Sequence, residues 1–486
     1  MVGLINYSKG DVMSKEEKVV EAKEQKQEIL TKGVPDIVAA INKSAKTTRI
    51  APLSQAKSLY VKRYFSGSFG IDYVTGGGYT YKRILLLYGH KSSGKNSQLY
   101  QTIAYNQKVC RLCHRVLEKY YTQPIETMDR WTFVLRYFLN MPMCTCDSKA
   151  TPKVYMLFDY EKSLGIEDKK SVVVNQFFNK DTGEVVNENA VNEAKAKLGL
   201  LKEETSLDEE QKATIKELED FLAPIESRSA VLERLPQTDY MVNCGINIDE
   251  LLVADPEDAN EGVDIIKKII RSREIDGIIW DSLQAALPKY VKDRSADDAT
   301  MGQEAKLNGL LMRQITAAYA SENLLDEAEA YKPTVFLTSQ VRSDLGAMYA
   351  KPDSYSGGNA VHHHISLAME IKREQFLDIN GREASFGTTY HGQRTRIRAE
   401  KNKISSPGDM FLYDYYFKKT PEFSVGSIDH VGELISLGLI FNVIDQRGAW
   451  FYYKDYKANG KADLRDSLSG DREMVIELCK DIYNRF

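Results

Sequence analysis

Eight consecutive residues, Gly89 to Asn96, have the glycine and lysine spacing of a phosphate-binding loop up to the last position. The apolar run RILLLYG before the loop is typical of a buried strand, and SSGKNSQLYQTIAYNQ is typical of a helix. At such a junction, backbone N–H groups surround an anion at the positive end of the helix dipole. We therefore predict a nucleotide-phosphate site, with Lys95 reaching the β- and γ-phosphates. Its predicted contacts are Gly89, Lys91, Ser92, Ser93, Gly94 and Lys95.

Asn96 stands at the position where such loops usually carry the Ser or Thr that binds Mg²⁺. Two alternatives follow. Either the amide oxygen of Asn96 replaces the hydroxyl, or the next residue, Ser97, supplies it. The departure weakens the metal assignment but leaves the phosphate site intact.

Two carboxylates end apolar runs that are typical of strands. Asp281 ends GIIWD and is predicted to support Mg²⁺ and water, although an aspartate that caps a following helix has the same pattern. Glu161 follows KVYMLFDY and is predicted to polarise the attacking water, the alternative being a solvated loop residue. Both would lie at the carboxyl edge of a parallel sheet, near the phosphates.

Four of the six cysteines form two short hooks, Cys110-x-x-Cys113 and Cys144-x-Cys146. Four thiolates at this spacing suit tetrahedral Zn²⁺ that ties together an insertion too small to build much core. His114 could replace one ligand, and free thiols or an iron–sulfur cluster are the other interpretations. The remaining cysteines are isolated and are predicted to be packed thiols.

The triplet His362-His363-His364 resembles a metal clamp. Consecutive residues on a strand point to opposite faces, however, so three adjacent histidines rarely chelate one ion. A contact with DNA or with another subunit is the preferred interpretation.

The elements that must position these residues alternate between strands and helices. The pattern predicts an α/β fold with a mostly parallel twisted sheet and helices on both faces. A polar helical arm (1–58) precedes the core (59–420), and a small α+β domain (421–486) follows it. Two insertions interrupt the core, at about 108–150 with the cysteines and at about 168–238, where Glu, Lys and Ala predict a surface helical hairpin.

Composition excludes several classes of protein. The 486 residues include 65 basic and 69 acidic side chains, with 43% hydrophobic and 28% charged residues. These values exclude a mostly disordered chain, a collagen-like chain and a coiled-coil rod. No apolar run reaches the roughly 18–20 residues that span a bilayer, and the amino terminus turns charged too early for a signal peptide. We expect a cytoplasmic protein in a reducing compartment, and a near-neutral charge does not exclude nucleic acid.

The ordered motifs resemble the RecA-family strand-exchange recombinases. The resemblance runs through SGSFGIDYVTGGG, GHKSSGKNS, FDYEKS, IIWDS, SQVRSDLGAMYAKPDSYSGGNAVHHHIS and KNKISSP, and covers about 60–486 apart from the insertions. The chain departs from the family at Asn96, in both insertions and in lacking an acidic tail after Phe486. The last two of these departures, the helical insertion after Glu161 and the lack of the tail, suggest a divergent, phage-encoded member similar to the UvsX group.

The resemblance implies a role for each matching residue. Gln340 would sense the γ-phosphate and pass that state to a DNA-binding loop, and Lys401 and Lys403 would reach the ATP of a neighbouring subunit. The matching DNA-binding positions are Lys306, Arg313, Arg342, Gly357, Gly358 and Asn359. Without the resemblance, the basic residues would be read as solvated side chains on a helix face or a strand edge.

The implied function is that of a DNA-dependent ATPase that uses ATP and Mg²⁺, polymerises on single-stranded DNA and exchanges that strand with a homologous duplex. Single-strand-binding and loader proteins would be further partners, in a bacterial or phage-infected cytoplasm. A ring-forming ATPase or helicase-type motor is one alternative. A non-catalytic ATP-binding filament protein, disabled by Asn96, is another.

Overall fold

The structure is a computed structural model of the chain. It describes residues 34–45, 47–125, 127–161, 170–179, 185–186, 188–203, 209–234, 236–292, 303–342, 354–355, 358–385 and 389–485.

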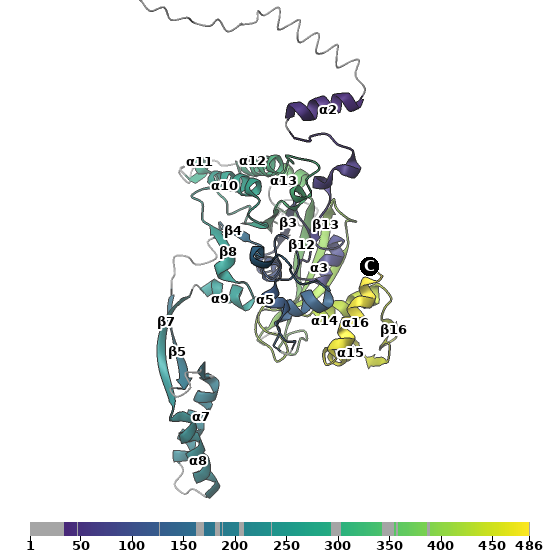
Figure 1. Ribbon diagram of the computed structural model, residues 1–486. Helices are drawn as coiled ribbons and strands as arrows, with labels where there is room; N and C mark the ends of the chain where they lie inside the picture. The colour runs from purple at the N-terminus through teal and green to yellow at the C-terminus, as the bar shows by residue number, and fades with distance from the viewer. Residues whose placement is uncertain are drawn as a thin grey trace, which may run out of the picture.

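A ten-stranded sheet forms the centre of the molecule (Figure 1). Its strand order is β15-β14-β13-β12-β3-β10-β9-β4-β8, with β11 paired to β10 outside this path. Neighbouring strands from β12 to β8 are parallel, whereas β12 to β15 pair antiparallel. The predicted mostly parallel α/β fold is therefore confirmed. The strands are β3 (Ile84–Gly89), β4 (Tyr155–Asp159), β8 (Leu251–Ala254), β9 (Gly277–Asp281), β10 (Thr334–Arg342), β11 (Ser354–Tyr355), β12 (Leu367–Leu377), β13 (Gly392–Asn402), β14 (Met410–Tyr416) and β15 (Ser427–Ile428).

Strand β3 shows why both faces of the sheet are covered. Successive side chains of a strand point to opposite faces. Leu85 and Leu87 belong to one buried cluster, and Ile84 and Leu86 belong to the other. The first cluster includes side chains of helices α3 (Phe69–Thr75) and α4 (Lys95–Asn106), and the second includes those of α10 (Ala259–Ser272), α12 (Gln303–Ala318) and α13 (Gly358–His364).

The carboxyl-terminal segment packs against the first face. Leu434, Leu464 and Leu478 lie in the same buried cluster as Leu85. This segment contains α14 (His430–Ile440), β16 (Asp445–Arg447), β17 (Trp450–Tyr453), β18 (Tyr456–Asn459), α15 (Lys461–Ser469) and α16 (Arg472–Tyr483). The proposed boundary near residue 421 stays a prediction.

Short elements complete the core and its first insertion. The amino-terminal side contains α2 (Val34–Ala45), which stands apart from the core in Figure 1, two 3-10 turns (Leu53–Gln55 and Lys57–Leu59), β1 (Arg63–Tyr64) and β2 (Tyr79–Thr80). The cysteine-bearing insertion contains α5 (Glu118–Tyr121), α6 (Arg130–Phe133), a π-helical turn (Val134–Phe138) and a 3-10 turn (Asp147–Lys149). Further short elements are α9 (Pro236–Asn243), α11 (Lys289–Lys292) and the 3-10 turns Ile248–Glu250 and Glu327–Tyr331. None of the described helices is long and apolar enough to cross a membrane.

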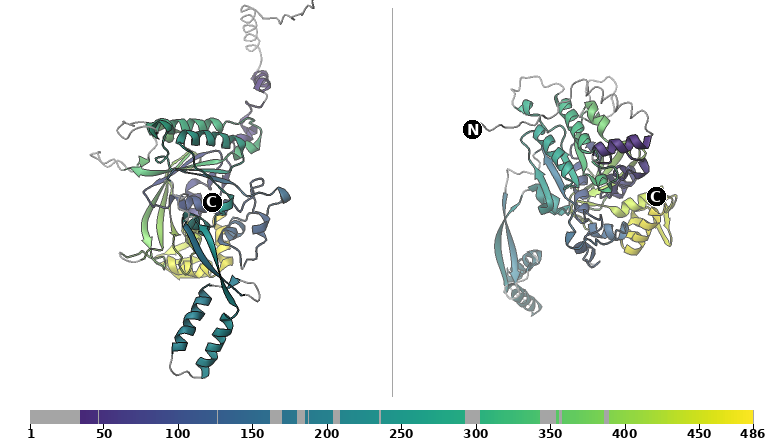
Figure 2. Two further views of the ribbon diagram at one scale, coloured as in Figure 1. Left: turned by 90° about the vertical axis from the view of Figure 1, so that its left-hand side faces the viewer. Right: turned by 45° about the horizontal axis from the view of Figure 1, so that its top comes forward.

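The second insertion projects from the core as an arm (Figures 1 and 2). Its charged segment forms helices α7 (Glu188–Glu203) and α8 (Glu209–Leu222), which an ion pair of 2.6 Å joins between Lys202 and Glu219. An antiparallel ribbon of β5 (Lys170–Asn179) and β7 (Ile225–Arg234) carries this hairpin, and β6 (Val185–Val186) pairs with β5. The ribbon was not predicted from the sequence.

A buried carboxyl on α3 makes stability depend on pH. Burial raises the pKa of Asp72 to about 7, although Ser66 donates to its Oδ1 from N at 3.0 Å and from Oγ at 2.6 Å. The folded state therefore binds this proton more tightly than the unfolded state. The free energy of unfolding should be lowest above pH 7 and should rise as the pH falls through 7.

We predict that Asp72→Asn raises the melting temperature at pH 8 by about 2–5 °C and flattens its dependence between pH 8 and pH 6. The amide oxygen can still accept from Ser66. Thermal unfolding followed by circular dichroism measures both effects, and the exposed Asp36→Asn is the control. A variant that melts at or below the unaltered protein at pH 8 would contradict the argument.

Candidate nucleotide site and cysteine cluster

The phosphate loop connects β3 to α4, as the sequence predicted. Lys95 Nζ donates to the carbonyl oxygens of Gly89 at 3.1 Å and His90 at 3.0 Å. The lysine side chain therefore reaches back across the loop to its first two residues. Burial lowers the pKa of Lys95. A Cβ at Gly89 would lie 2.0 Å from the Ile371 carbonyl oxygen, so a side chain has no room here. The loop conformation therefore depends on glycine at its first position.

Strands β12 and β13 hold the loop from the other side. Arg373 Nη1 donates to the Ser92 carbonyl at 3.1 Å, and Gln393 Nε2 donates to the Ser93 carbonyl at 2.9 Å. Neither residue was predicted from the sequence, because each lies far along the chain and belongs to no local motif.

Asp281 ends β9 and is 4% exposed. Asn96 Nδ2 donates to its Oδ2 at 2.8 Å, and Thr338 Oγ1 donates to its Oδ1 at 2.5 Å. Burial raises the pKa of Asp281 to about 6, whereas these two donors favour the charged form. The carboxylate is thus held beside the first turn of α4. Thr338, two residues before Gln340 on the buried strand, was not predicted.

Ser97 lies in a different environment from Asn96. Tyr240 Oη donates to Ser97 Oγ at 3.1 Å. Tyr240 belongs to α9, which follows the arm. Asn96, and not Ser97, is thus the residue that contacts Asp281.

Glu161 and Gln340 face each other across the carboxyl edge of the sheet. Gln340 Nε2 lies 3.5 Å from Glu161 Oε1, and both side chains are exposed. Gln340 is the register partner of Gly89 in the pairing of β10 with β3. The predicted residues Lys95, Asn96, Asp281, Glu161 and Gln340 therefore come from separate strands and one helix to a single edge.

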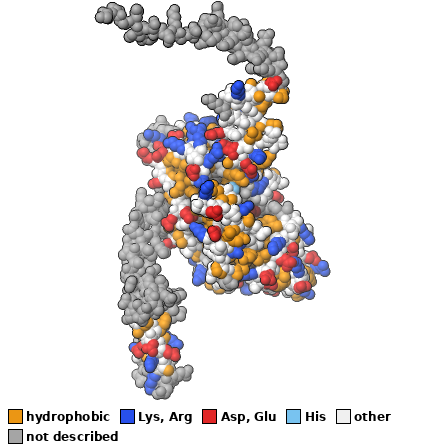
Figure 3. Space-filling model, in the orientation of Figure 1, with side chains coloured by type: hydrophobic (Ala, Val, Ile, Leu, Met, Phe, Trp, Pro, Cys, Tyr) orange, Lys and Arg blue, Asp and Glu red, His pale blue; other side chains and the backbone are white. Residues whose placement is uncertain are grey.

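The predicted DNA-binding residues lie on α12, β10 and α13. Lys306 and Arg313 are exposed on α12. On the face drawn in Figure 3, basic side chains gather at the upper edge, where α10 and α12 lie. Arg342 ends β10, whereas Gly358 and Asn359 begin α13. Gly357 and residues 343–353 of the predicted loop lie outside the described residues.

Lys401 and Lys403 contact the end of α13 within the same chain. Lys401 Nζ donates to the His362 carbonyl, and Lys403 Nζ donates to the His363 carbonyl at 2.6 Å. The histidine triplet lies on this helix and not on a strand, so the strand argument against a metal clamp was wrong. His364 Nδ1 instead lies 2.9 Å from Thr316 Oγ1.

The two cysteine hooks come together. The sulfur atoms of Cys110, Cys113, Cys144 and Cys146 all lie within 4.8 Å of one another, and those of Cys113 and Cys144 are 3.4 Å apart. Tetrahedral Zn²⁺ with bonds of about 2.3 Å places its sulfur ligands about 3.8 Å apart, so the cluster fits this ion. His114 is not part of it, because its ring stacks on Tyr331 with centroids 4.2 Å apart.

Backbone N–H groups near the cluster also suit thiolate ligands. Burial raises the pKa of Cys110, but backbone donors at Cys113, Leu112 and Thr151 outweigh burial and bring it to about 7. The Cys146 N–H lies 3.4 Å from Cys144 Sγ. Such donors stabilise negative charge on sulfur, which a metal ligand must carry.

Comparison with known proteins finds similarity to RecA. A family model described as the RecA N-terminal domain matches residues 213–420. Protein RecA of Legionella pneumophila (strain Corby) is 29% identical over 244 residues, which are 50% of this chain and 64% of that protein. Protein RecA of Bordetella avium (strain 197N) is 28% identical over 240 residues, which are 49% of this chain and 62% of that protein.

These matches support a divergent RecA-family protein. The resemblance found in its motifs is thereby confirmed. The family match contains Asp281, Gln340 and the Lys401–Lys403 pair. The match begins after the phosphate loop, so the assignment of the loop depends on its sequence spacing and its geometry. The chain spans less than two thirds of the length of these two relatives.

Proposed function

We propose that this RecA-family protein is an ATP-dependent recombinase that forms filaments on single-stranded DNA and promotes strand exchange. One observation carries the proposal. The phosphate loop, the buried Asp281 and Gln340 meet at one sheet edge, and the Gln340 strand continues into the segment that resembles a DNA-binding loop. The two residues that follow Gln340, up to Arg342, therefore connect the proposed nucleotide site to the proposed DNA-binding loop.

Each residue at the edge has a proposed task. Lys95 and the loop N–H groups hold the phosphates, and Asp281 with Asn96 holds Mg²⁺, which supplies charge neutralisation when bound. Glu161 is exposed at the edge and would orient water and accept its proton. Lys401 and Lys403 would reach the nucleotide of the next subunit.

DNA would be held mainly through its phosphates. Lys306 and Arg313 lie on one exposed helix face, and Arg342, Gly357, Gly358 and Asn359 flank the loop. Affinity based on such contacts falls steeply with salt. Duplex DNA, further copies of the chain, single-strand-binding and loader proteins are the proposed partners, in the cytoplasm of a bacterium or of a phage-infected cell.

The deciding experiment measures ATP hydrolysis with and without single-stranded DNA, with electron microscopy of the same samples. Stimulated hydrolysis and open filaments of variable length support the proposal. Closed particles of fixed mass would favour the ring-forming motor. ATP binding without hydrolysis would favour the non-catalytic alternative, to which the unusual contact of Asn96 with Asp281 lends weight.

The contrast between Asn96 and Ser97 gives a prediction for the metal. Asn96→Ala removes a donor to Asp281 and a potential Mg²⁺ ligand, so the Mg²⁺ concentration for half-maximal hydrolysis should rise about tenfold. Ser97→Ala should leave it nearly unchanged, because Ser97 accepts from Tyr240. Magnesium titrations of the ATPase rate test both. A rise for Ser97→Ala alone would reverse the assignment.

Gln340 gives a prediction for coupling. Gln340→Ala should keep ATP binding but lose most of the difference in DNA affinity between an ATP analogue and ADP. Arg342→Ala should instead weaken DNA binding with either nucleotide, since it is proposed to contact phosphate. Fluorescence anisotropy at one fixed salt concentration measures the affinities. A Gln340→Ala protein that retains the full difference contradicts the sensor role.

We further propose that the cysteine cluster holds a structural Zn²⁺. Its four sulfur atoms lie close enough to share one tetrahedral ion, and Cys110 and Cys144 are buried. With all four positions taken by cysteine, such an ion would have no open position for a substrate, so its proposed role is to stabilise the fold.

A further inference from the structure

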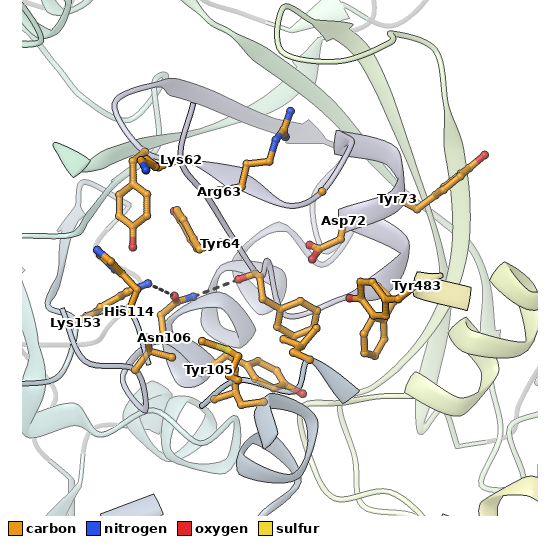
Figure 4. Close-up of a pocket in the computed structure, with 18 of the residues that line it drawn as sticks. Lys62, Arg63, Tyr64, Asp72, Tyr73, Tyr105, Asn106, His114, Lys153 and Tyr483 are labelled. Atoms are coloured by element: carbon orange, nitrogen blue, oxygen red, sulfur yellow. Dashed lines mark hydrogen bonds between the residues drawn. The ribbon is translucent and has the colours of Figure 1, made fainter. Parts of the chain in front are cut away.

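A second site lies away from the phosphate loop. A cavity of about 370 Å³ opens between the segment before the loop, the cysteine-bearing insertion and the carboxyl-terminal helix α16 (Figure 4). Tyr64 of the segment before the loop lines the cavity, as do His114 and Leu139 of the cysteine-bearing insertion. Tyr483 of α16 lines its remaining side. Its volume is within the range of small-molecule sites in proteins.

The cavity contains a lysine that is 2% exposed, Lys153. Its Nζ donates to Asn106 Oδ1 at 3.1 Å and lies over the rings of Tyr64 and Tyr81, 5.1 and 5.2 Å from their centroids. In the described part of the chain no carboxylate lies within ion-pair distance of Lys153. The carboxylate of Asp276, which interacts with Lys153 electrostatically, lies beyond that distance. Its nearest acceptor is thus a neutral amide.

Two of the three other buried lysines in the described part of the chain have a carboxylate partner, whereas the third, Lys82, donates to the Ser58 carbonyl and to Ser321 Oγ. Lys108 is 7% exposed, lies 4.1 Å from the centroid of Tyr120 and pairs with Asp129 at 3.3 Å. Lys332 pairs with Glu329 at 3.1 Å. A buried cation without such a partner is costly, and an anion that enters the cavity would compensate it.

Two polar atoms near Lys153 have no hydrogen-bond partner among the residues that the structure describes. Tyr81 Oη is buried and forms no hydrogen bond within the described residues, and the residue is 3% exposed. His114 Nδ1 is likewise buried and unpaired among them. Both residues line the cavity. Buried polar groups are nearly always paired with protein or ordered water, so a bound molecule could take the place of water at these two atoms.

The rest of the lining defines the body of that molecule. Aromatic side chains line the cavity between its ends, among them Tyr64, Phe65, Phe69 and Tyr105. Such walls favour a flat aromatic ring. Asp72 lies across the cavity from Lys153 in Figure 4, where it would accept from a donor.

We propose that this cavity binds a small aromatic carboxylate, with the carboxylate on Lys153 Nζ and the ring between the aromatic walls. A hydroxyl or amino group at the far end of the ligand would donate to Asp72. The inference is independent of the proposed recombinase function, since none of the phosphate-loop residues lines the cavity.

The test uses the full-length protein and two probes of nearly equal shape, phenylacetate and its neutral amide, phenylacetamide. Isothermal titration calorimetry should show phenylacetate binding with a Kd of about 1 mM or tighter and the amide at least about tenfold weaker. Equal affinity for the two probes, or no heat from phenylacetate at about 10 mM, overturns the proposal.

Three variants locate the site. Lys153→Met should reduce phenylacetate affinity at least about tenfold without lowering the melting temperature, because it removes a buried charge. Lys108→Met is the matched control and should bind phenylacetate as the unaltered protein does. Leu139→Trp keeps every charge and fills the cavity, so it should block both probes. Unchanged phenylacetate affinity in Lys153→Met or in Leu139→Trp contradicts the assignment.

Discussion

Replacing Lys95 by alanine is expected to reduce ATP hydrolysis at least about a hundredfold, the scale on which loss of one preorganised charge acts. Lys95 already spans the phosphate loop through the Gly89 and His90 carbonyls, so its ammonium is positioned before nucleotide arrives. Burial lowers the pKa of Lys95, because the charged ammonium is less stable away from water. An anion beside it would stabilise the charge again. Steady-state release of phosphate at saturating ATP measures the loss.

The control for this experiment is Lys119→Ala, which removes an exposed lysine from the cysteine-bearing insertion. It should hydrolyse ATP at the rate of the unaltered protein. Circular dichroism of the Lys95→Ala protein should match that of the control. Hydrolysis at the unaltered rate in Lys95→Ala would remove the assignment of the phosphate loop.

Removing the cysteine cluster should have the largest effect on stability. Cys144→Ser, or treatment with a strong chelator, should lower the melting temperature by roughly 5–10 °C, because structural zinc contributes directly to folding. The effect should reach the core through Arg111, within the first hook. Its guanidinium donates to the Arg273 carbonyl at 2.5 Å and pairs with Glu274 at 2.7 Å, just before β9.

Elemental analysis provides the second measurement. The unaltered protein should contain about one zinc ion per chain, and Cys144→Ser should contain none. Cys479→Ala is the matched control, since Cys479 is buried but lies outside the cluster. It should retain the metal. Absence of zinc from protein purified without chelators, together with unchanged melting of Cys144→Ser, would favour free thiols.

Local patterns predicted the parts of the site that are continuous in the chain. A buried strand, a glycine-rich loop and a helix follow one another, so Lys95 and Asn96 could be placed from spacing alone. Asp281 and Glu161 follow apolar strands whose carboxyl ends must meet at one edge. The cysteine cluster could be predicted in the same way, because two cysteines that lie only two or three positions apart in the chain can readily bind one ion.

Contacts that join distant segments left no such signal. Gln393 reaches the phosphate loop from 300 positions away, and Tyr240 reaches Ser97 from beyond the arm. The β-ribbon of the arm was missed because the charged helical stretch dominated the composition of the insertion. The histidine triplet was treated as part of a strand, whereas it lies on helix α13, where His364 contacts Thr316 of α12.

The ribbon of the arm makes the second insertion a removable part. Lys170, at the start of β5, is the register partner of Arg234, at the end of β7. Partners in an antiparallel ladder have Cα atoms about 5 Å apart. The chain therefore enters and leaves the arm at two points that lie side by side. A two-residue turn could close the chain after excision, and a foreign hairpin could replace the arm without moving a strand of the central sheet. The arm is therefore the natural point for attaching a label or a second domain.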